Sequence, residues 1–176
     1  MVDGRLQRMT VLICDDNQNM RELLRAILQA LGVVHIIDGR EGDHAIQKLR
    51  DFNIDLVITD WAMEPKDGLD LTRWIRNDPD SPDQFMPVIM VTGHTEMDRI
   101  TKARDAGVTE FIAKPISARS LYQRLCSIIQ NPRPFVRTKD YFGPDRRRKS
   151  EPFTGPDRRQ GASTAGSAAQ TADARA

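Results

Sequence analysis

Acidic, hydroxyl and ammonium side chains stand at the ends of four short apolar runs. They are Asp15, Asp16, Asp60, Thr92 and Lys114. Clustered carboxylates favour a hard divalent cation such as Mg²⁺, while a hydroxyl and an ammonium can hold anionic oxygens. Together these groups suit phosphoryl transfer, in which positioning and charge neutralisation carry most of the catalysis. The acceptor would be a carboxylate that forms an acyl phosphate, and Asp60 is the first candidate.

The apolar runs before these groups predict the strands of a parallel sheet. They are short and rich in β-branched residues, as strands buried on both faces are. Five strands are expected, over residues 10–14, 33–37, 54–60, 87–91 and 110–113. Because parallel strands point the same way, the groups at their carboxyl ends meet at one edge, where open sheets bind ligands.

Apolar residues at helical spacing predict one helix after each strand. The five helices are expected over residues 18–31, 41–50, 69–76, 95–106 and 117–130. Asn17 and Ser117 are expected to begin the first and last helices, and Gly32 and Gly107 to end two of them. This alternation indicates an α/β fold, a doubly wound parallel sheet with helices on both faces.

Composition limits the class of protein. The chain has 176 residues and a net charge of +1, so its overall charge points neither to nucleic acid nor to a membrane surface. No apolar run approaches the roughly 20 residues that a membrane helix needs, and residues 1–10 lack the apolar core of a signal peptide. Cys14 and Cys126 have no metal-ligand spacing and are expected to be reduced thiols, as in a cytoplasmic protein.

Each candidate group also has a purely structural explanation. Asp15 and Asp16 could cap a helix and interact with its dipole. Thr92 could be an ordinary strand residue, and Lys114 a solvated surface lysine. The three histidines have no ligand spacing, so none is expected to bind metal. The functional prediction therefore depends on the order of the groups along the chain and not on any one of them.

Residues 10–130 resemble the receiver domain of response regulators, the CheY-like family of two-component signalling. The matching motifs are Val11-Leu12-Ile13-Cys14-Asp15-Asp16, then Leu56-Val57-Ile58-Thr59-Asp60-Trp61-Ala62-Met63 with Asp67-Gly68, then Val91-Thr92-Gly93, and Phe111-Ile112-Ala113-Lys114-Pro115. Each motif is weak alone, but all occur in order and at family-like spacing. The resemblance implies a flavodoxin-like sheet with the strand order 2-1-3-4-5.

The resemblance also implies roles at the carboxylates. Asp60 matches the aspartate that accepts the phosphoryl group. Asp15 and Asp16 match the acidic pair that binds Mg²⁺ together with Asp60, and Ala62 matches the position that lends its backbone carbonyl to the metal. The family often has a polar side chain where Ala62 stands, on the route of an attacking water, so this residue bears on the lifetime of the phosphoryl group.

Further roles implied by the resemblance belong to the switch. Thr92 matches the hydroxyl that moves onto the phosphoryl group, and Lys114 matches the lysine that contacts it. The bond between Lys114 and Pro115 is expected to be cis. Phe111 matches the aromatic residue whose rotamer reports activation, without the phenolic hydroxyl of the more common tyrosine.

The composition changes after Gln130. We expect an N-terminal extension over residues 1–9, a receiver domain over 10–130, a basic tail over 131–160 and a disordered low-complexity tail over 161–176. An aromatic-x-Gly-Pro-Asp-Arg-Arg motif occurs twice, at residues 141–147 and 153–159. Residues 133–159 hold nine lysines and arginines against four acids, a net charge of +5, which leaves −4 for the rest.

Three interpretations of the basic tail remain open. It could be a solvated disordered segment, or a docking peptide that presents one motif twice. It could also fold back onto the acidic receiver domain and mask or support its output face. Nucleic-acid binding through the tail is a further alternative, although no DNA-binding fold accompanies it.

The expected function is that of a single-domain response regulator and not of an enzyme with an external substrate. A histidine kinase or histidine phosphotransfer protein would donate the phosphoryl group, with Mg²⁺ as cofactor. The output would be binding of another protein, and a phosphorylation-dependent homodimer is left open. A phosphorelay intermediate or phosphate sink is the close alternative, and a DNA- or scaffold-binding regulator a more distant one.

Two other classes fit the residues less well. An aspartyl-phosphate phosphatase usually has a second acid two residues after its acceptor, where this chain has Ala62. A flavodoxin-like cofactor binder needs a phosphate loop after the first strand, where Asp15 and Asp16 would repel an anion.

Overall fold

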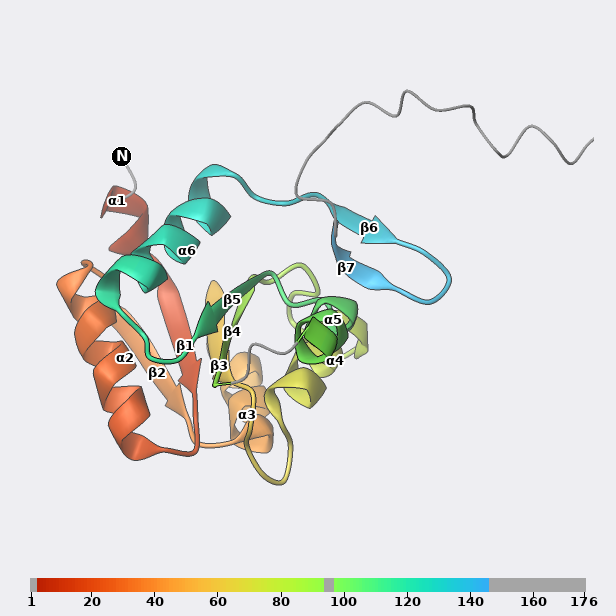
Figure 1. Ribbon diagram of the computed structural model, residues 1–176, viewed down its shortest axis with the longest axis horizontal. Coiled ribbons are helices and arrows are strands. Elements are labelled where there is room, and N and C mark those ends of the chain that lie inside the picture. Colours follow the sequence, from red (N-terminus) through yellow and green to blue (C-terminus); the bar gives the residue numbers. More distant parts are fainter. Residues whose placement is uncertain (1–2, 94–96, 146–176) are drawn as a thin grey trace, which may run out of the picture. The chain divides into compact units, whose positions relative to one another are not determined.

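The computed structural model of the protein describes residues 3–93 and 97–145. At its centre is a five-stranded parallel sheet in the order β2-β1-β3-β4-β5 (Figure 1). The strands are β1 (Thr10–Cys14), β2 (His35–Gly39), β3 (Leu56–Asp60), β4 (Val88–Thr92) and β5 (Glu110–Ala113). The predicted α/β fold and strand order are therefore confirmed.

Helices cover both faces of the sheet. In the described residues they are α1 (Asp3–Leu6), α2 (Gln18–Ala30), α3 (Gly42–Asp51), α4 (Gly68–Asn77), α5 (Met97–Ala106) and α6 (Ala118–Gln130). Helices α2 and α6 pack on one face, and α3, α4 and α5 on the other (Figure 1). None of these helices is both long and apolar enough to cross a membrane.

The core lies on both sides of the sheet because successive strand residues point to opposite faces. In β1, Val11 and Ile13 pack with α2 and α6, whereas Leu12 and Cys14 pack with α3 and α4. Met90 of β4 belongs to a third, smaller cluster with α5. Two-sided burial explains why these strands are continuous apolar runs.

The predicted helix ends agree with the observed capping. The Asn17 side chain accepts hydrogen bonds from the first backbone N–H groups of α2, and Ser117 forms a capping box at the start of α6. Gly32 and Gly107 adopt φ values of +92° and +94°, which an L side chain rarely adopts. Both glycines directly follow a helix end, as predicted.

The second strand begins two residues later than the sequence predicts. The backbone N–H of Val33 donates to the carbonyl oxygen of Leu28 at 3.0 Å, so Val33 closes the end of α2 and does not join the sheet. Such a bond across a positive-φ glycine is a common helix termination. The predicted start of the fourth helix, at residue 95, lies outside the described residues.

The N-terminal segment contains a helix that the sequence pattern did not indicate. Leu6 of α1 is fully buried in the apolar cluster of α2 and α6. The Arg5 guanidinium donates to the carbonyl oxygen of Ile129, near the end of α6, at 3.1 Å. A helix of four residues carries too little periodicity to be recognised, and its position depends on these contacts with α6.

Beyond α6, two short strands form a hairpin. They are β6 (Phe135–Arg137) and β7 (Phe142–Pro144), which pair in antiparallel register. Both lie in the segment predicted as a basic tail, and they belong to the same compact unit as the sheet. The described part of this segment therefore folds back onto the receiver domain.

The burial of Leu6 gives the first prediction. Replacement Leu6→Ala should lower the free energy of unfolding by about 2–5 kcal/mol, because it opens a cavity in the core. Urea denaturation followed by circular dichroism measures the change. The matched control is Leu23→Ala on α2, where the side chain is 44% exposed and the cost should be below roughly 0.5 kcal/mol. Equal costs would show that α1 does not hold the core.

Candidate functional site

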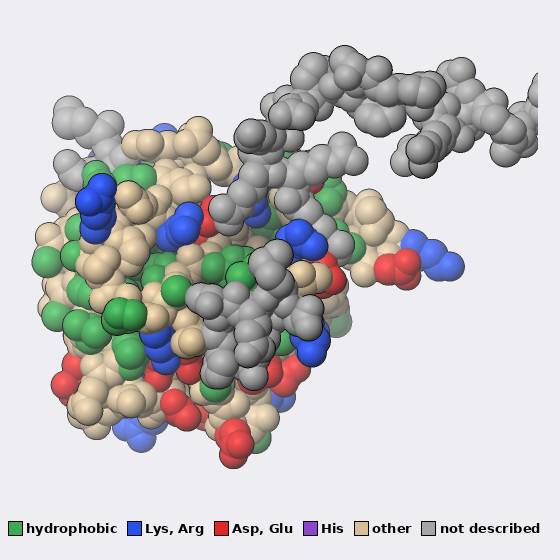
Figure 2. Space-filling model, in the orientation of Figure 1, with side chains coloured by type: hydrophobic (Ala, Val, Ile, Leu, Met, Phe, Trp, Pro, Cys, Tyr) green, Lys and Arg blue, Asp and Glu red, His purple; other side chains and the backbone are tan. Residues whose placement is uncertain are grey.

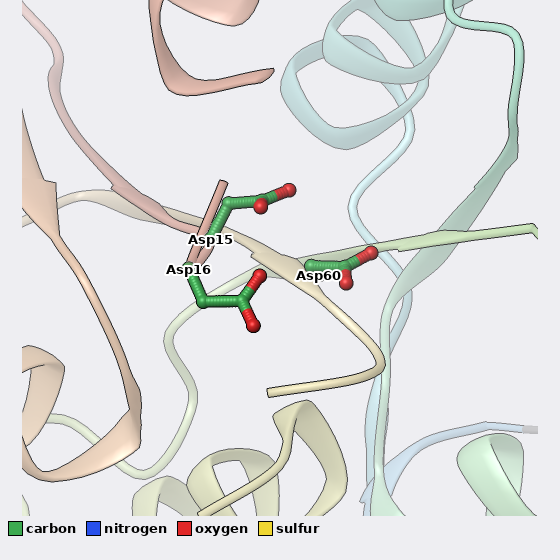
Figure 3. A group of neighbouring side chains, drawn as sticks. All are labelled: Asp15, Asp16 and Asp60. Atoms are coloured by element: carbon green, nitrogen blue, oxygen red, sulfur yellow. The ribbon is translucent and has the colours of Figure 1, made fainter. Parts of the chain in front are cut away.

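Three carboxylates meet at the carboxyl edge of the sheet (Figure 3). Asp15 and Asp16 follow β1, and Asp60 is the last residue of β3. Each offers an oxygen, and these oxygens all lie within 4.8 Å of one another. Asp15 is fully buried, Asp60 is 6% exposed and Asp16 is exposed, so the cluster opens to solvent on one side.

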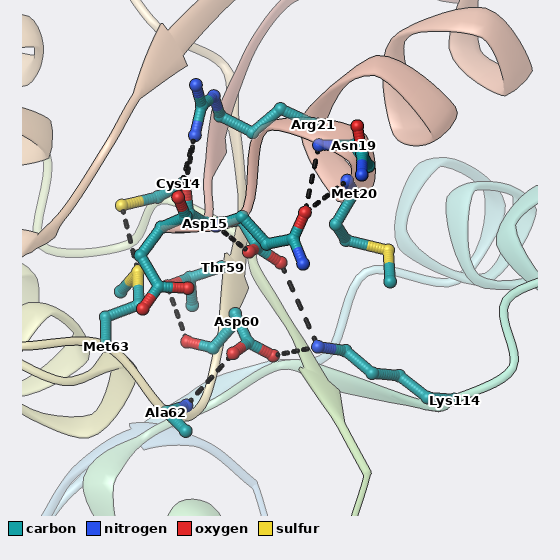
Figure 4. Close-up of polar contacts among 12 residues, drawn as sticks. Cys14, Asp15, Asn19, Met20, Arg21, Thr59, Asp60, Ala62, Met63 and Lys114 are labelled. Atoms are coloured by element: carbon teal, nitrogen blue, oxygen red, sulfur yellow. Dashed lines mark hydrogen bonds and ion pairs between the residues drawn. The ribbon is translucent and has the colours of Figure 1, made fainter.

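The loop that carries the acidic pair is fixed by contacts with α2 (Figure 4). Asp15 Oδ1 accepts a hydrogen bond from the backbone N–H of Asn17 at 2.8 Å. The buried Arg21 guanidinium donates to the backbone carbonyl oxygens of Asp15 at 2.8 Å and Asp16 at 3.3 Å. A cation thus lies behind the two acids without occupying their side-chain oxygens.

Asp60 is engaged through both side-chain oxygens. Oδ2 accepts from the backbone N–H of Ala62 at 3.2 Å, and Oδ1 lies 2.9 Å from Lys114 Nζ as an ion pair. A Cβ at Gly68 would lie 2.2 Å from the Asp60 carbonyl oxygen, so only glycine fits where α4 begins beside β3. This close approach explains the Asp67-Gly68 pair in the sequence.

Lys114 links β5 to the acidic cluster. Its Nζ lies 3.9 Å from Asp15 Oδ2, besides its shorter contact with Asp60. Its backbone N–H donates to the carbonyl oxygen of Thr92 at 2.8 Å, and its bond to Pro115 is cis, as expected. In the described residues the Glu64–Pro65 bond is also cis, which the sequence analysis did not anticipate.

The two predicted switch residues lie on neighbouring strands, Thr92 on β4 and Phe111 on β5. Thr92 ends β4 and is buried, next to β3, whose Asp60 pairs with Val91. Phe111 is half-buried on β5, against the apolar cluster that includes Met90. The structure therefore brings the carboxylates and Lys114 into direct contact, and it places Phe111 further along the sheet.

Burial and like charges shape the electrostatics of the acidic cluster. Burial is the largest cause of the raised pKa of Asp15, and repulsion from Asp60 and Asp16 raises this pKa further. The Asn17 N–H and Lys114 oppose this rise. Asp15 Oδ2 is buried and makes no hydrogen bond. A divalent cation would satisfy this oxygen and remove the repulsion, so the donor set fits Mg²⁺.

Cys14 is not a candidate nucleophile although it adjoins the cluster. Burial, together with the nearby Asp15 carboxylate, raises the pKa of its thiol to about 12. Its Sγ donates to Met63 Sδ at 3.5 Å inside the core. The thiol therefore stays protonated and packs as a small apolar group, because only the thiolate is reactive.

Arg21 is the site residue that the sequence analysis missed. It lies three and seven residues before Leu24 and Leu28, so it shares the buried face of α2 with them. An arginine on an otherwise apolar helix face is a signal that could have been read, since a buried cation needs acceptors. Here those acceptors are the carbonyl oxygens of the acidic loop.

The sequence of the chain is similar to the sequences of known proteins. Residues 11–126 match the family model for the response regulator receiver domain, about two thirds of the chain. The chemotaxis protein CheY of Pseudomonas aeruginosa is 34% identical over 122 residues, which cover 69% of this chain and 97% of that protein. The chemotaxis protein CheY-3 of Vibrio cholerae is 33% identical over 124 residues, or 70% of this chain and 94% of that protein.

Solved structures give the same result. A putative response regulator from Chloroflexus aurantiacus matches with a TM-score of 0.64 and 25% identity, over 70% of this chain and 98% of its own. The CheX-CheY-BeF3-Mg complex from Borrelia burgdorferi contains a chain that matches with a TM-score of 0.62 and 27% identity, over 69% and 89%. Sequence, fold and site geometry agree, and the chain belongs to the family of response regulator receiver domains.

Proposed function

We propose that the protein is a single-domain response regulator whose Asp60 accepts a phosphoryl group from a histidine kinase or a histidine phosphotransfer protein. The observation that carries this proposal is the contact of 2.9 Å between Asp60 Oδ1 and Lys114 Nζ at the edge of an acidic cluster. A buried carboxylate held beside an ammonium is positioned both to attack phosphorus and to have its product stabilised.

Asp15, Asp16 and Asp60, with the backbone carbonyl of Ala62, would hold Mg²⁺. The ion supplies charge neutralisation when bound, so that an anionic phosphoryl group can approach three carboxylates. Asp15 Oδ2 supports this assignment, because it is buried and accepts no hydrogen bond, and leaving a buried carboxylate oxygen without a hydrogen-bond donor is costly. The Arg21 guanidinium keeps the backbone of the acidic pair in place while their side chains stay available.

In the proposed transfer, a carboxylate oxygen of Asp60 forms a bond to phosphorus as the bond from phosphorus to the donor histidine nitrogen breaks. The freed nitrogen keeps the electron pair of the broken bond. Lys114 Nζ, already beside Asp60, would pair with a phosphoryl oxygen, and the Thr92 hydroxyl would donate to another. Attack of water on phosphorus would then break the bond to the Asp60 oxygen, release inorganic phosphate and return Asp60 to a carboxylate.

The proposed output is binding of another protein through the surface of α5, β5 and α6. Thr92 and Phe111 would couple the phosphoryl group to this surface, because they belong to β4 and β5 beside α5. The Borrelia burgdorferi structure, a complex of CheX with CheY, supports output through protein binding. A phosphorelay intermediate or phosphate sink would use the same chemistry at Asp60.

We infer that the protein acts in the cytoplasm, together with its phosphoryl donor.

Phosphoryl uptake is the direct test of this function. The wild-type chain should take up one phosphoryl group from acetyl phosphate in the presence of Mg²⁺, measured by intact mass. Asp60→Ala should abolish uptake, because it removes the carboxylate that lies 2.9 Å from Lys114 Nζ. Chelation of Mg²⁺ should lower the rate of uptake by at least about tenfold. The bound metal stabilises the charge of the transition state, which contributes several kcal/mol.

The matched control is Asp51→Asn, an exposed acid at the end of α3, which should leave uptake unchanged. Uptake by Asp60→Ala at the wild-type rate would refute the assignment of the acceptor. A folded wild-type protein that takes up nothing from acetyl phosphate, and nothing from any histidine phosphotransfer donor, would refute the function as a whole.

Asp15 should make Mg²⁺ binding and stability depend on pH. Because its pKa is higher in the folded than in the unfolded protein, the metal-free folded state takes up a proton more readily. The free energy of unfolding should therefore rise as the pH falls through the raised pKa, until the unfolded chain is protonated too. Mg²⁺ affinity should fall over the same range, because protons compete for the ligand.

Asp15→Asn tests this prediction, since it removes the charge and keeps the Oδ1 acceptor for Asn17. This variant should be more stable than wild type at neutral pH without metal, and should bind Mg²⁺ at least about tenfold more weakly. Trp61, beside the site, reports binding by fluorescence. The exposed neighbour Asp16→Asn should also lose affinity but gain less stability. Unchanged affinity in Asp15→Asn would exclude Asp15 from the metal site.

A further inference from the structure

The described part of the tail binds the receiver domain at the end of the sheet opposite Asp60. In the hairpin, Phe135 lies opposite Pro144, and Arg137 opposite Phe142. Figure 1 shows the hairpin beside α4 and α5, and charged side chains of both signs lie at its tip (Figure 2). The hairpin and the residue after it contain the first Gly-Pro-Asp of the repeated motif, so the contacts of the hairpin show what surrounds this part of the motif.

A buried arginine joins the hairpin to three parts of the receiver domain. Arg76, near the end of α4, is 1% exposed. Its guanidinium donates to the carbonyl oxygens of Gly107 at 3.0 Å and Gln84 at 2.9 Å, and to the Thr109 hydroxyl at 3.5 Å. The Phe135 ring covers it, with 5.1 Å from Cζ to the ring centroid. Burial lowers the pKa of Arg76 to about 10, so it stays a cation at neutral pH.

Three aromatic rings form the apolar part of this contact. Phe85, in the loop before β4, meets Phe135 at 5.1 Å and Phe142 at 5.3 Å between ring centroids. The Arg137 guanidinium lies over the Phe142 ring at 4.1 Å. Edge-to-face rings and cation–π pairs stabilise a contact beyond what their buried area contributes. Phe85 therefore anchors both strands of the hairpin.

The glycine of the motif is required by close backbone packing. A Cβ at Gly143 would lie 2.9 Å from the Cα of Gly107 and 2.6 Å from the Tyr141 hydroxyl. A Cβ at Gly107 would lie 3.1 Å from the carbonyl oxygen of Phe142. The Tyr141 hydroxyl donates to the carbonyl oxygen of Pro144 at 2.7 Å and closes the hairpin on itself. The motif thus fits the glycine that ends α5.

The residues held by the hairpin continue directly into the proposed switch. Arg133, two residues before β6, donates to the carbonyl oxygen of Thr109 at 3.4 Å, and Thr109 lies two residues before Phe111. Ala106, the last residue of α5, and Val108, two residues after it, belong to the apolar cluster against which Phe111 packs. A movement of α5 or β5 would therefore disturb the contacts of the hairpin.

We propose that the β6–β7 hairpin is an intramolecular regulator, a peptide ligand that holds the junction of α5 and β5 in its unphosphorylated arrangement. Its release then favours phosphorylation of Asp60. By reciprocity of coupling, phosphorylation weakens the binding of the hairpin to the same extent. The proposal rests on the function proposed above, but its structural half, the restraint of α5 and β5 by the hairpin, can be measured without phosphorylation.

Gly143→Ala in the full chain tests the restraint, because one added methyl group meets the Gly107 backbone and leaves the receiver side of the contact intact. Hydrogen exchange should accelerate at the hairpin amides of Thr138 and Asp145, and also at those of Gly107 and Thr109, by roughly fivefold or more. The matched control is Gly4→Ala, whose Cβ would meet nothing within 4 Å and which should exchange like wild type.

A second variant tests the restraint even where the protein accommodates the methyl group added at residue 143. Phe135→Ala combined with Phe142→Ala removes two of the three rings and should have the same effect on exchange. If the hairpin amides stay protected in both variants, the contacts described do not hold the hairpin and the proposal fails. If the hairpin is released while Gly107 and Thr109 exchange as before, the restraint is absent and the proposal also fails.

Phosphoryl uptake from acetyl phosphate completes the test. Both released variants should take up phosphoryl roughly fivefold or more faster than wild type and Gly4→Ala, as expected for a coupling of this kind. Released variants that take it up at the wild-type rate would overturn the regulatory proposal while leaving the function of Asp60 intact. A wild type that takes up none would instead count against the proposed function, and the exchange data would still decide the restraint.

Discussion

The mutual repulsion of three carboxylates at one edge of the sheet is the constraint on which the site depends. Asp15 and Asp60 are buried, so solvent screens their repulsion poorly. The fold holds them together by placing cations on two sides, Lys114 between their oxygens and Arg21 behind the loop. Neither cation fills the open side next to the exposed Asp16, which is the side of the proposed metal ion and phosphoryl group.

The opposite end of the sheet also buries a charge, which here is a cation. Arg76 is a buried cation, and carbonyl oxygens at the ends of helix and loop segments accept its hydrogen bonds. Without the hairpin, the Phe135 ring would no longer cover this guanidinium, and Phe85 would be more exposed. The hairpin therefore completes the burial of this charge through the Phe135 ring.

Much of the fold and of the candidate site could be predicted because both follow from local patterns. Strands buried on both faces are continuous apolar runs, and in a parallel sheet the groups after them, such as Asp60 and Lys114, converge on one edge. The α1 helix and the hairpin could not be predicted, because their structure depends on distant contacts. Leu6 is buried by α2 and α6, and Gly143 is required by Gly107, which lies 36 residues earlier in the chain. No periodicity records such contacts.

The two ends of the sheet are connected through rigid elements, and this gives the tail motif a physical reason to affect the site. β4 and β5 begin beside Phe85, which contacts the hairpin, and Thr109, which contacts the segment just before it. β4 ends at Thr92, and Lys114, which contacts Asp60, directly follows β5. A close-packed sheet transmits a displacement because it compresses little. Coupling requires that the same elements have two arrangements that both ends can favour. The contact that holds the hairpin consists of one buried cation and three rings. It is small enough for a change between the two arrangements to release the hairpin.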